Sequence, residues 1–313
     1  MILITGAGGQ IGGVLTKALQ QRYGLSHVLP TDIHAGTFDG DLFELLDITD
    51  VERLRKLVVK YSVTEIYHLA AVLSARGESH PIPTWDINMK GLLNVLEMGR
   101  EGLVEKIFFP SSIAVFGDEV PLDFAPQFGA LIPKTVYGIS KVAGESWCNY
   151  YHLKYGVDVR SVRFPGIIGY ETMPGGGTTD YAVEIYHAAV KGERFVCYIA
   201  PDVKMPMIYM KDAIRAVIEL MEAPKERVQV RTSYNLASMS FAPAEIYAAI
   251  KKEMPGFEIA YEPDFRDEIA RSWPDQLDDE RARTDWMWLP EFDLESMTKD
   301  MILHLLKQNA EIR

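Results

Sequence analysis

The chain opens with MILITGAGGQIGG, residues 1–13. A short apolar run leads into glycines at positions 6, 9 and 12, and a helical pattern follows, so the stretch predicts a strand, a tight turn and a helix. Glycine suits this turn because it tolerates positive φ and lets backbone amides approach a pyrophosphate at the helix N-terminus. We therefore expect a dinucleotide to bind along the turn, at Gly6, Gly9, Gln10, Ile11 and Gly12.

An acid follows the second apolar run. The segment HVLPTD ends at Asp32, about 20 residues past the last glycine, where a carboxylate can bind ribose hydroxyls. No lysine or arginine between Thr31 and Asp41 would attract a 2′-phosphate, so the pattern favours NAD over NADP. The alternative is a glycine-rich turn that serves only to pack the helix against the strand.

Composition limits the classes of protein and partner. With 313 residues, the chain exceeds the usual size of one domain, and 44 acidic against 32 basic residues argue against a nucleic-acid or anionic membrane partner. Two cysteines, Cys148 and Cys197, provide neither a disulfide framework nor a zinc site. No apolar run is long enough to cross a bilayer, so we expect a cytoplasmic protein. With no set of ligand-spaced cysteines, we also expect no bound metal.

Strands and helices alternate through the first half. We expect strands at Asp41–Asp47, Glu65–Ala71, Lys106–Ser112 and within Val157–Ile168, and helices from a capping box at Thr49–Glu52 to about Tyr61, at Trp85–Arg100 and at Tyr137–Tyr155. This order predicts an α/β fold of the Rossmann type, a doubly wound parallel sheet covered on both faces. Ligands of such folds bind at the carboxyl ends of the strands.

The regular alternation ends near residue 168. A glycine-rich loop spans Tyr170–Thr179, and helices at Lys211–Glu222 and Ala244–Glu253 flank the strand-like SYNLA. We predict a cofactor-binding domain at residues 1–168 and a smaller, mixed α/β substrate domain at residues 169–313. Some elements of the second domain are expected to cross back to the first.

Tyr137 and Lys141 are four residues apart on a predicted helix and therefore share one face. An ammonium neighbour and a cationic nicotinamide both favour the phenolate, which would make Tyr137 a general base for a hydroxyl proton. The spacing recurs at Tyr150 with Lys154 and at Tyr247 with Lys251. Only Tyr137 follows a loop rich in proline and glycine and opens its helix, which places it at the ligand end of the sheet.

Two serines, Ser111 and Ser112, end the strand KIFFPSS at the same edge of the sheet. Their hydroxyls are suited to hold a substrate oxygen against the base. The alternative is that they cap the strand end.

Motifs along most of the chain occur in the order of one family. TGAGGQIG (5–12), HLAA (68–71), SSIAVFG (111–117), YGISK (137–141) and RFPGIIG (163–169) together resemble the extended short-chain dehydrogenase/reductase family. The resemblance implies that Ser112 is the active-site hydroxyl, Tyr137 the acid/base and Lys141 its partner on the nicotinamide ribose. It also implies further cofactor contacts, at Asp47, Ile48, Leu69, Ala70, Ala71, Asn88, Phe164 and Ile167. One departure is Phe116, where many sugar-nucleotide relatives carry tyrosine.

Two later segments, residues 174–192 and 272–288, resemble the short-chain, metal-independent L-threonine 3-dehydrogenases. This implies NAD-dependent oxidation of L-threonine at its 3-hydroxyl to 2-amino-3-ketobutyrate. Amides of Gly175 to Gly177, with Thr178 or Thr179 capping the next helix, would form an anion site for the substrate carboxylate; the alternative is a hinge loop. Candidate substrate contacts are Ser74, Ser111, Ser112, Tyr137, Gly177, Thr178 and Thr179, whereas Trp273 and Trp286 are interpreted as core or interface aromatics.

Competing functions stay open at this point. A sugar-nucleotide 4-epimerase or dehydratase would use the same tyrosine and lysine but must also hold a diphosphate, for which Arg266, Arg271, Arg281 and Arg283 are the available cations. A non-catalytic NAD sensor would not need the serine, tyrosine and lysine. Zinc-dependent dehydrogenation is disfavoured by the lack of suitably spaced cysteines and histidines. The resemblance further suggests a homodimer built on residues 88–100 and 137–155.

Overall fold

The computed structural model describes residues 1–36, 42–73, 77–173 and 177–311. Its centre is a seven-stranded sheet in the order β10-β6-β5-β4-β1-β2-β3, in which every neighbouring pair is parallel. The strands are β1 (Ile2–Thr5), β2 (Val28–Asp32), β3 (Glu44–Leu45), β4 (Glu65–His68), β5 (Lys106–Ser112), β6 (Asp158–Phe164) and β10 (Tyr234–Asn235). The predicted doubly wound Rossmann-type fold is confirmed.

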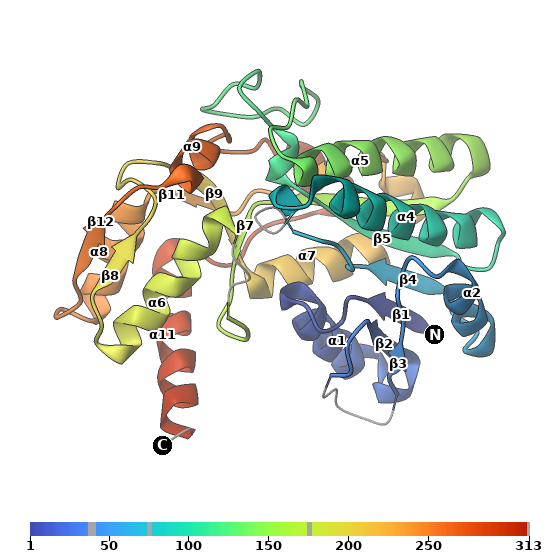
Figure 1. The fold of residues 1–313 in the computed structure, drawn as a ribbon, viewed down its shortest axis with the longest axis horizontal. Coiled ribbons are helices and arrows are strands. Elements are labelled where there is room, and N and C mark those ends of the chain that lie inside the picture. Colours follow the sequence, from blue (N-terminus) through green and yellow to red (C-terminus); the bar gives the residue numbers. More distant parts are fainter. Residues whose placement is uncertain (37–41, 74–76, 174–176, 312–313) are drawn as a thin grey trace.

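Helices cover both faces of this sheet (Figure 1). One face packs against α1 (Gln10–Tyr23), α7 (Met210–Glu222) and α10 (Glu280–Trp286), and the other against α2 (Val51–Lys60), α4 (Pro81–Arg100) and α5 (Val136–Tyr155). Consecutive strand residues alternate between the two cores: Ile66 faces one and Tyr67 the other, as do Ile107 and Phe108. The strands are near-continuous apolar runs because both of their faces are buried.

A smaller layer forms the second lobe of Figure 1. Its strands are β7 (Gly166–Ile168), β9 (Met205–Tyr209) and β11 (Met239–Phe241) in one sheet, and β8 (Phe195–Cys197) with β12 (Ile259–Tyr261) in another. Its helices are α6 (Tyr181–Lys191), α8 (Pro243–Glu253), α9 (Phe265–Arg271) and α11 (Leu294–Glu311). Although α7, β10 and α10 follow residue 168, they pack on the large sheet. The domain division itself stays a prediction.

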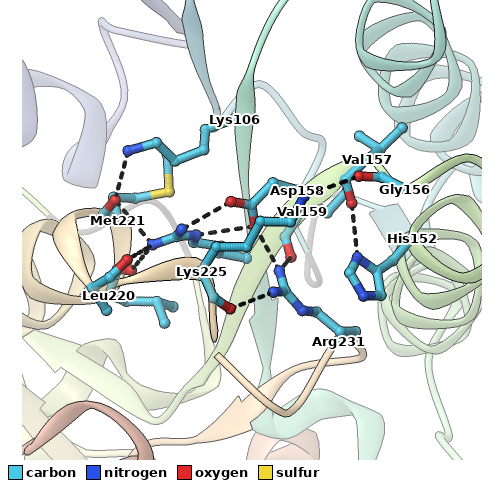
Figure 2. Close-up of polar contacts among 12 residues, drawn as sticks. Lys106, His152, Gly156, Val157, Asp158, Val159, Leu220, Met221, Lys225 and Arg231 are labelled. Carbon is cyan, nitrogen blue, oxygen red and sulfur yellow. Dashed lines mark hydrogen bonds and ion pairs between the residues drawn. The ribbon is translucent and has the colours of Figure 1, made fainter. Parts of the chain in front are cut away.

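A buried charged cluster fixes α7 to the sheet (Figure 2). Arg160 Nη1 donates to the carbonyl oxygens of Leu220 at 2.7 Å and Met221 at 3.0 Å, where α7 ends. Asp158 pairs with Arg160 at 2.8 Å and with Arg231 at 2.5 Å. Cations at a helix C-terminus satisfy its last carbonyls and oppose its negative dipole end. The cluster lies at the amino-terminal end of β6, the end opposite Phe164.

Several element boundaries differ from the sequence-based expectation. Helix α4 begins at Pro81 rather than Trp85. Proline is tolerated in the first turn because the backbone N–H groups there have no partner within the helix, so the N–H that proline lacks is not missed. Asp50, not Thr49, caps α2 by accepting from the Arg53 amide at 3.0 Å. Strand β3 keeps only two residues at the sheet edge, and β4 ends at His68. The expected strand 157–168 is divided at Pro165, which has no N–H to donate to a ladder.

Candidate active site

One cavity lies beyond the carboxyl ends of β1, β4, β5 and β6 and holds about 1190 Å³ of empty space, counting its open mouth. It runs from the glycine turn to the loop that precedes α6. The predicted residues that line it are Gly6, Gly9, Gln10, Ile11, Gly12, Leu69, Ala71, Ser111, Ser112, Tyr137, Lys141, Phe164, Ile167, Gly177, Thr178 and Thr179. Residues more than 170 positions apart in the chain therefore meet at one edge of the sheet.

The glycine turn is folded as a dinucleotide cradle requires. Gly6 has a φ of +69°, and a Cβ on Gly12 would lie 2.2 Å from the Gly6 carbonyl oxygen. Neither position accepts a side chain without a shift of backbone. The Gly8 amide donates to Asp32 Oδ2 at 2.9 Å, which holds the carboxylate beside the turn. These residues fit NAD, since the bare backbone faces the cavity and the acid lies where ribose hydroxyls would bind.

Five predicted cofactor contacts lie outside the cavity wall, and Asp32, which accepts from the Gly8 amide, is one of them. Ile48 is buried in the core against Gly91, and exposed Asp47 accepts from the Thr49 amide and hydroxyl at 2.8 Å. Asn88 clamps Val72, accepting from its amide at 2.8 Å and donating to its carbonyl at 3.1 Å. The Ala70 amide donates to Thr5 Oγ1. Two substrate predictions, Ser74 and the Gly175–Gly176 part of the loop, lie outside the described residues.

The two serines have different surroundings. Ser112 Oγ accepts from the Ala114 amide at 3.2 Å and so caps the short helix Ile113–Val115, which leaves its own proton for donation. Ser111 Oγ donates to Glu145 at 2.6 Å and is buried. Ser112 is therefore the hydroxyl that can serve the cavity, whereas the Ser111 hydroxyl is committed to Glu145.

Tyr137 and Lys141 occupy the first turns of α5, which Thr135 caps by accepting from the Gly138 amide at 3.0 Å. Lys141 Nζ donates to the Pro110 carbonyl at 2.6 Å and lies 5.3 Å from the centre of the Tyr137 ring. Burial lowers the pKa of Lys141 to about 8. Burial also raises the pKa of Tyr137 to about 12, and a hydrogen bond with Ser112 opposes this rise only in part. In the free chain, which lacks the nicotinamide charge, the Tyr137 pKa is therefore above its ordinary value.

The loop before α6 departs from the expected anion site. Neither threonine caps the helix; Thr178–Asp180 forms a short 3-10 turn, and Asp180 is the N-cap residue of α6. The Gly177 amide donates to Asp180 Oδ2 at 2.5 Å, so a side chain of the protein already occupies this donor. Two further residues line the cavity: Asp180, which was not predicted, and Trp273, which was predicted as a core or interface aromatic and also lies in the core of the smaller layer. No local pattern marks Trp273, because it reaches the site only through the fold.

Charge in the cavity wall is sparse. Of the lining residues that the structure describes, Lys141 is the only lysine or arginine and Asp180 the only acid. The four arginines considered for a diphosphate pair with acids elsewhere: Arg266 with Asp264, Arg271 with Asp267, Arg281 with Asp285 and Arg283 with Asp279.

Within the described ranges, no three side chains of His, Cys, Asp or Glu gather as a metal site would need. None of the helices described is both long and apolar enough to cross a bilayer.

Comparisons with known proteins agree with this fold. The sequence model of the NAD dependent epimerase/dehydratase family matches residues 2–237. An uncharacterised epimerase/dehydratase of Staphylococcus haemolyticus is 47% identical over 96% of both chains. A GalE-like L-threonine dehydrogenase from Cupriavidus necator, in its holo form, is 52% identical with a TM-score of 0.96, over 97% of this chain and 99% of that one. A monomeric L-threonine 3-dehydrogenase from a metagenome is 44% identical with a TM-score of 0.95, over 99% of this chain and 100% of that one.

Proposed function

This chain belongs to the NAD dependent epimerase/dehydratase family, so NAD is its cofactor, and we propose that it oxidises L-threonine at the 3-hydroxyl to 2-amino-3-ketobutyrate. The observation that carries the proposal is a cavity that joins the glycine turn to Ser112, Tyr137 and the Thr178 loop. The likeness over nearly the whole chain to structures named as L-threonine dehydrogenases supports the same substrate.

The charge of the wall supports an amino acid over a sugar nucleotide. A nucleotide diphosphate carries two negative charges that proteins usually meet with several donors or cations. Here Asp180 is the acid of the wall, and the four arginines considered for a diphosphate are paired outside it. A carboxylate in the wall suits the α-ammonium of threonine and repels a diphosphate. The 4-epimerase or dehydratase alternative is therefore less well supported.

Proton removal falls to Tyr137. Its hydroxyl lines the cavity beside Ser112, with which it forms a hydrogen bond, and the Ser112 hydroxyl is suited to hold the substrate oxygen as well. In the proposed reaction the Tyr137 phenolate takes the proton of the 3-hydroxyl, and Ser112 keeps that oxygen in line. Burial raises the Tyr137 pKa to about 12 in the free chain, so the phenolate forms only when positive charge lies nearby.

Lys141 provides one such charge. It is held by the Pro110 carbonyl, lies 5.3 Å from the centre of the Tyr137 ring and lines the cavity. NAD⁺, when bound, supplies the hydride acceptor and a second positive charge on the nicotinamide. Asp32 beside the Gly8 amide would repel a 2′-phosphate, which supports NAD over NADP.

The test is NADH formation by the purified chain with NAD⁺ and L-threonine, beside D-threonine, L-serine and UDP-galactose, with and without a chelator. We expect reduction with L-threonine that survives the chelator. Interconversion of UDP-sugars without net NADH would instead establish the epimerase. An Asp180→Asn variant should raise KM for L-threonine by about tenfold, because it removes the charge proposed for the α-ammonium.

We also propose a cytoplasmic homodimer that forms through α4 and α5. Exposed apolar side chains on these helices, Ile82, Ile87, Ile139, Trp147 and Leu153, support the proposal. One similar structure is named as monomeric, so sedimentation of this chain is the deciding measurement.

A further inference from the structure

A buried ion pair lies behind the cavity, at the carboxyl end of β6. Arg163 donates to Glu145 through Nε at 2.8 Å and Nη2 at 2.7 Å, and the two side chains are 3% and 2% exposed. Buried charges are costly unless all their hydrogen-bonding groups are satisfied. Arg163 meets this condition, since Nη1 donates to the Gln127 carbonyl and to Asn235 Oδ1, each at 3.0 Å.

On one side the pair contacts the two elements, β5 and α5, that carry Ser112, Tyr137 and Lys141. Glu145 lies four residues after Lys141 on α5, one turn along the same face. Its Oε1 also accepts from Ser111 Oγ at 2.6 Å, and Ser111 precedes Ser112 at the end of β5. The carboxylate thus joins the strand end that carries Ser112 to the helix that carries Tyr137 and Lys141.

On the other side the pair reaches the segment that carries Trp273. Gln127, which accepts from Arg163, is tied to β10 by the Asn235 amide, which donates to Gln127 Oε1 at 2.9 Å. Two residues earlier, the Ala125 amide donates to the Gln276 carbonyl at 2.9 Å, and Ala125 forms a β-bridge with Leu277. Trp273, three residues before Gln276, lines the cavity.

We propose that the Arg163–Glu145 pair is a positioning unit that holds the Ser112 strand end, helix α5 and the Trp273 segment in register around the substrate, without touching the substrate itself. The identity of the substrate in this proposal rests on the proposed function. These three parts of the site come from distant stretches of chain, and hydrogen bonds link the pair, directly or through Gln127 and its neighbours, to all three. Loss of the pair should therefore misplace the substrate more than it lowers the affinity for NAD, because the glycine turn after β1 and Asp32 at the end of β2 are proposed to hold NAD.

The same strand provides a matched control. Asp158 at the opposite end of β6 forms buried ion pairs with Arg160 and Arg231, but these reach α7 and residues near Lys225 rather than the cavity (Figure 2). Asp158→Asn and Glu145→Gln each leave buried arginine without its charge partner. Glu145→Gln disturbs the carboxyl end of β6, beside the cavity, whereas Asp158→Asn disturbs its amino-terminal end.

The kinetic experiment compares Glu145→Gln with Asp158→Asn at a temperature below both melting transitions. For Glu145→Gln we expect kcat/KM for L-threonine to fall by about tenfold or more, with the Kd of NAD within about twofold of the unmodified chain. Asp158→Asn should keep both quantities within about twofold. Equal kinetic losses in the two variants, or unchanged kinetics in Glu145→Gln, would overturn the proposal.

A double variant, Glu145→Leu with Arg163→Met, separates positioning from stability if Glu145→Gln does not fold. Apolar replacement of a buried pair often restores stability. We expect the double variant to fold and still lose about tenfold in kcat/KM, whereas full kinetic recovery would show a purely structural role.

Hydrogen exchange provides a readout that needs no substrate. Glu145→Gln should speed amide exchange at residues 122–127 and 273–278, and Asp158→Asn at residues 220–231. If the unmodified chain does not oxidise L-threonine, the proposed function fails, yet this exchange pattern would still establish the linkage. An unchanged pattern in Glu145→Gln would refute the linkage whatever the substrate is.

Discussion

Helix α5 carries two tyrosine–lysine pairs of equal spacing, Tyr137 with Lys141 near its start and Tyr150 with Lys154 near its end. In both, the lysine nitrogen lies 5.3 Å from the centre of the tyrosine ring. At the exposed end, Lys154 Nζ donates to Tyr150 OH at 2.8 Å. At the buried end, the lysine instead donates to the Pro110 carbonyl, and the tyrosine hydroxyl is left to Ser112 and the cavity.

The difference in burial reverses the electrostatics. Mutual hydrogen bonding lowers the pKa of Tyr150 and raises that of Lys154, because each stabilises the charged form of the other. Desolvation raises the pKa of Tyr137 and lowers that of Lys141. The buried pair is therefore costly to charge in the free chain, and bound cofactor and substrate can change its protonation. A third pair, Tyr247 with Lys251, repeats the exposed arrangement at 2.7 Å.

The largest difference is expected between the variants that remove the hydroxyl of Tyr137 and the hydroxyl of Tyr150. Tyr137→Phe should lower kcat by about a thousandfold, since it deletes the general base, while NAD still binds. Tyr150→Phe should leave kcat within about twofold. The measurement is steady-state NADH formation with fluorescence titration of NAD. Similar losses in both variants would mean that α5 as a whole, rather than its buried end, supports the reaction.

A smaller effect is expected from the two lysines. Lys141→Met should lower kcat/KM by about a hundredfold, because a buried ammonium at Tyr137 and the proposed ribose contact are lost together. Lys154→Met is the control and should match the unmodified chain in kinetics. If Lys141→Met kept full activity, Lys141 would have no role in the reaction.

The smallest effect is a pH dependence confined to the buried end. With a Lys141 pKa of about 8, the ammonium fraction falls about tenfold between pH 7 and pH 9, so we expect NAD affinity to fall by a similar factor. His68, Tyr137, Glu145 and Cys148 are the titratable groups around this ammonium; His68 stays neutral because burial and Lys141 lower its pKa to about 3.

The matched variants for this titration are Lys141→Arg and Lys154→Arg. Arginine stays charged throughout the range, so Lys141→Arg should give a flat profile at whatever affinity it retains. Lys154→Arg should keep the slope of the unmodified chain. The measurement is a set of NAD titrations from pH 6.5 to 9.5. A slope that survives Lys141→Arg would assign the titration to another group.

Much of the fold could be predicted because its signals are local. The run KIFFPSS forms β5 with the predicted bounds, and the apolar periodicity after the Pro/Gly loop forms α5 one residue earlier than expected. Prediction failed where a boundary depends on partners. Within the described residues, strand β3 pairs with β2 alone and keeps two residues, and Thr49 is bonded to Asp47 instead of capping α2.

The order of motifs along the chain was enough to identify the family, the cofactor and the edge of the sheet where Ser112, Tyr137 and Lys141 meet. These are consequences of strand ends, turns and helix starts, which depend on neighbouring residues. Folding alone decided that Tyr137 is partly buried while Tyr150 is exposed, that Asp180 occupies the Gly177 amide, and that Arg163 pairs with Glu145. Burial and ion pairing join residues far apart in sequence, and their energies depend on a dielectric environment that exists only in the packed chain.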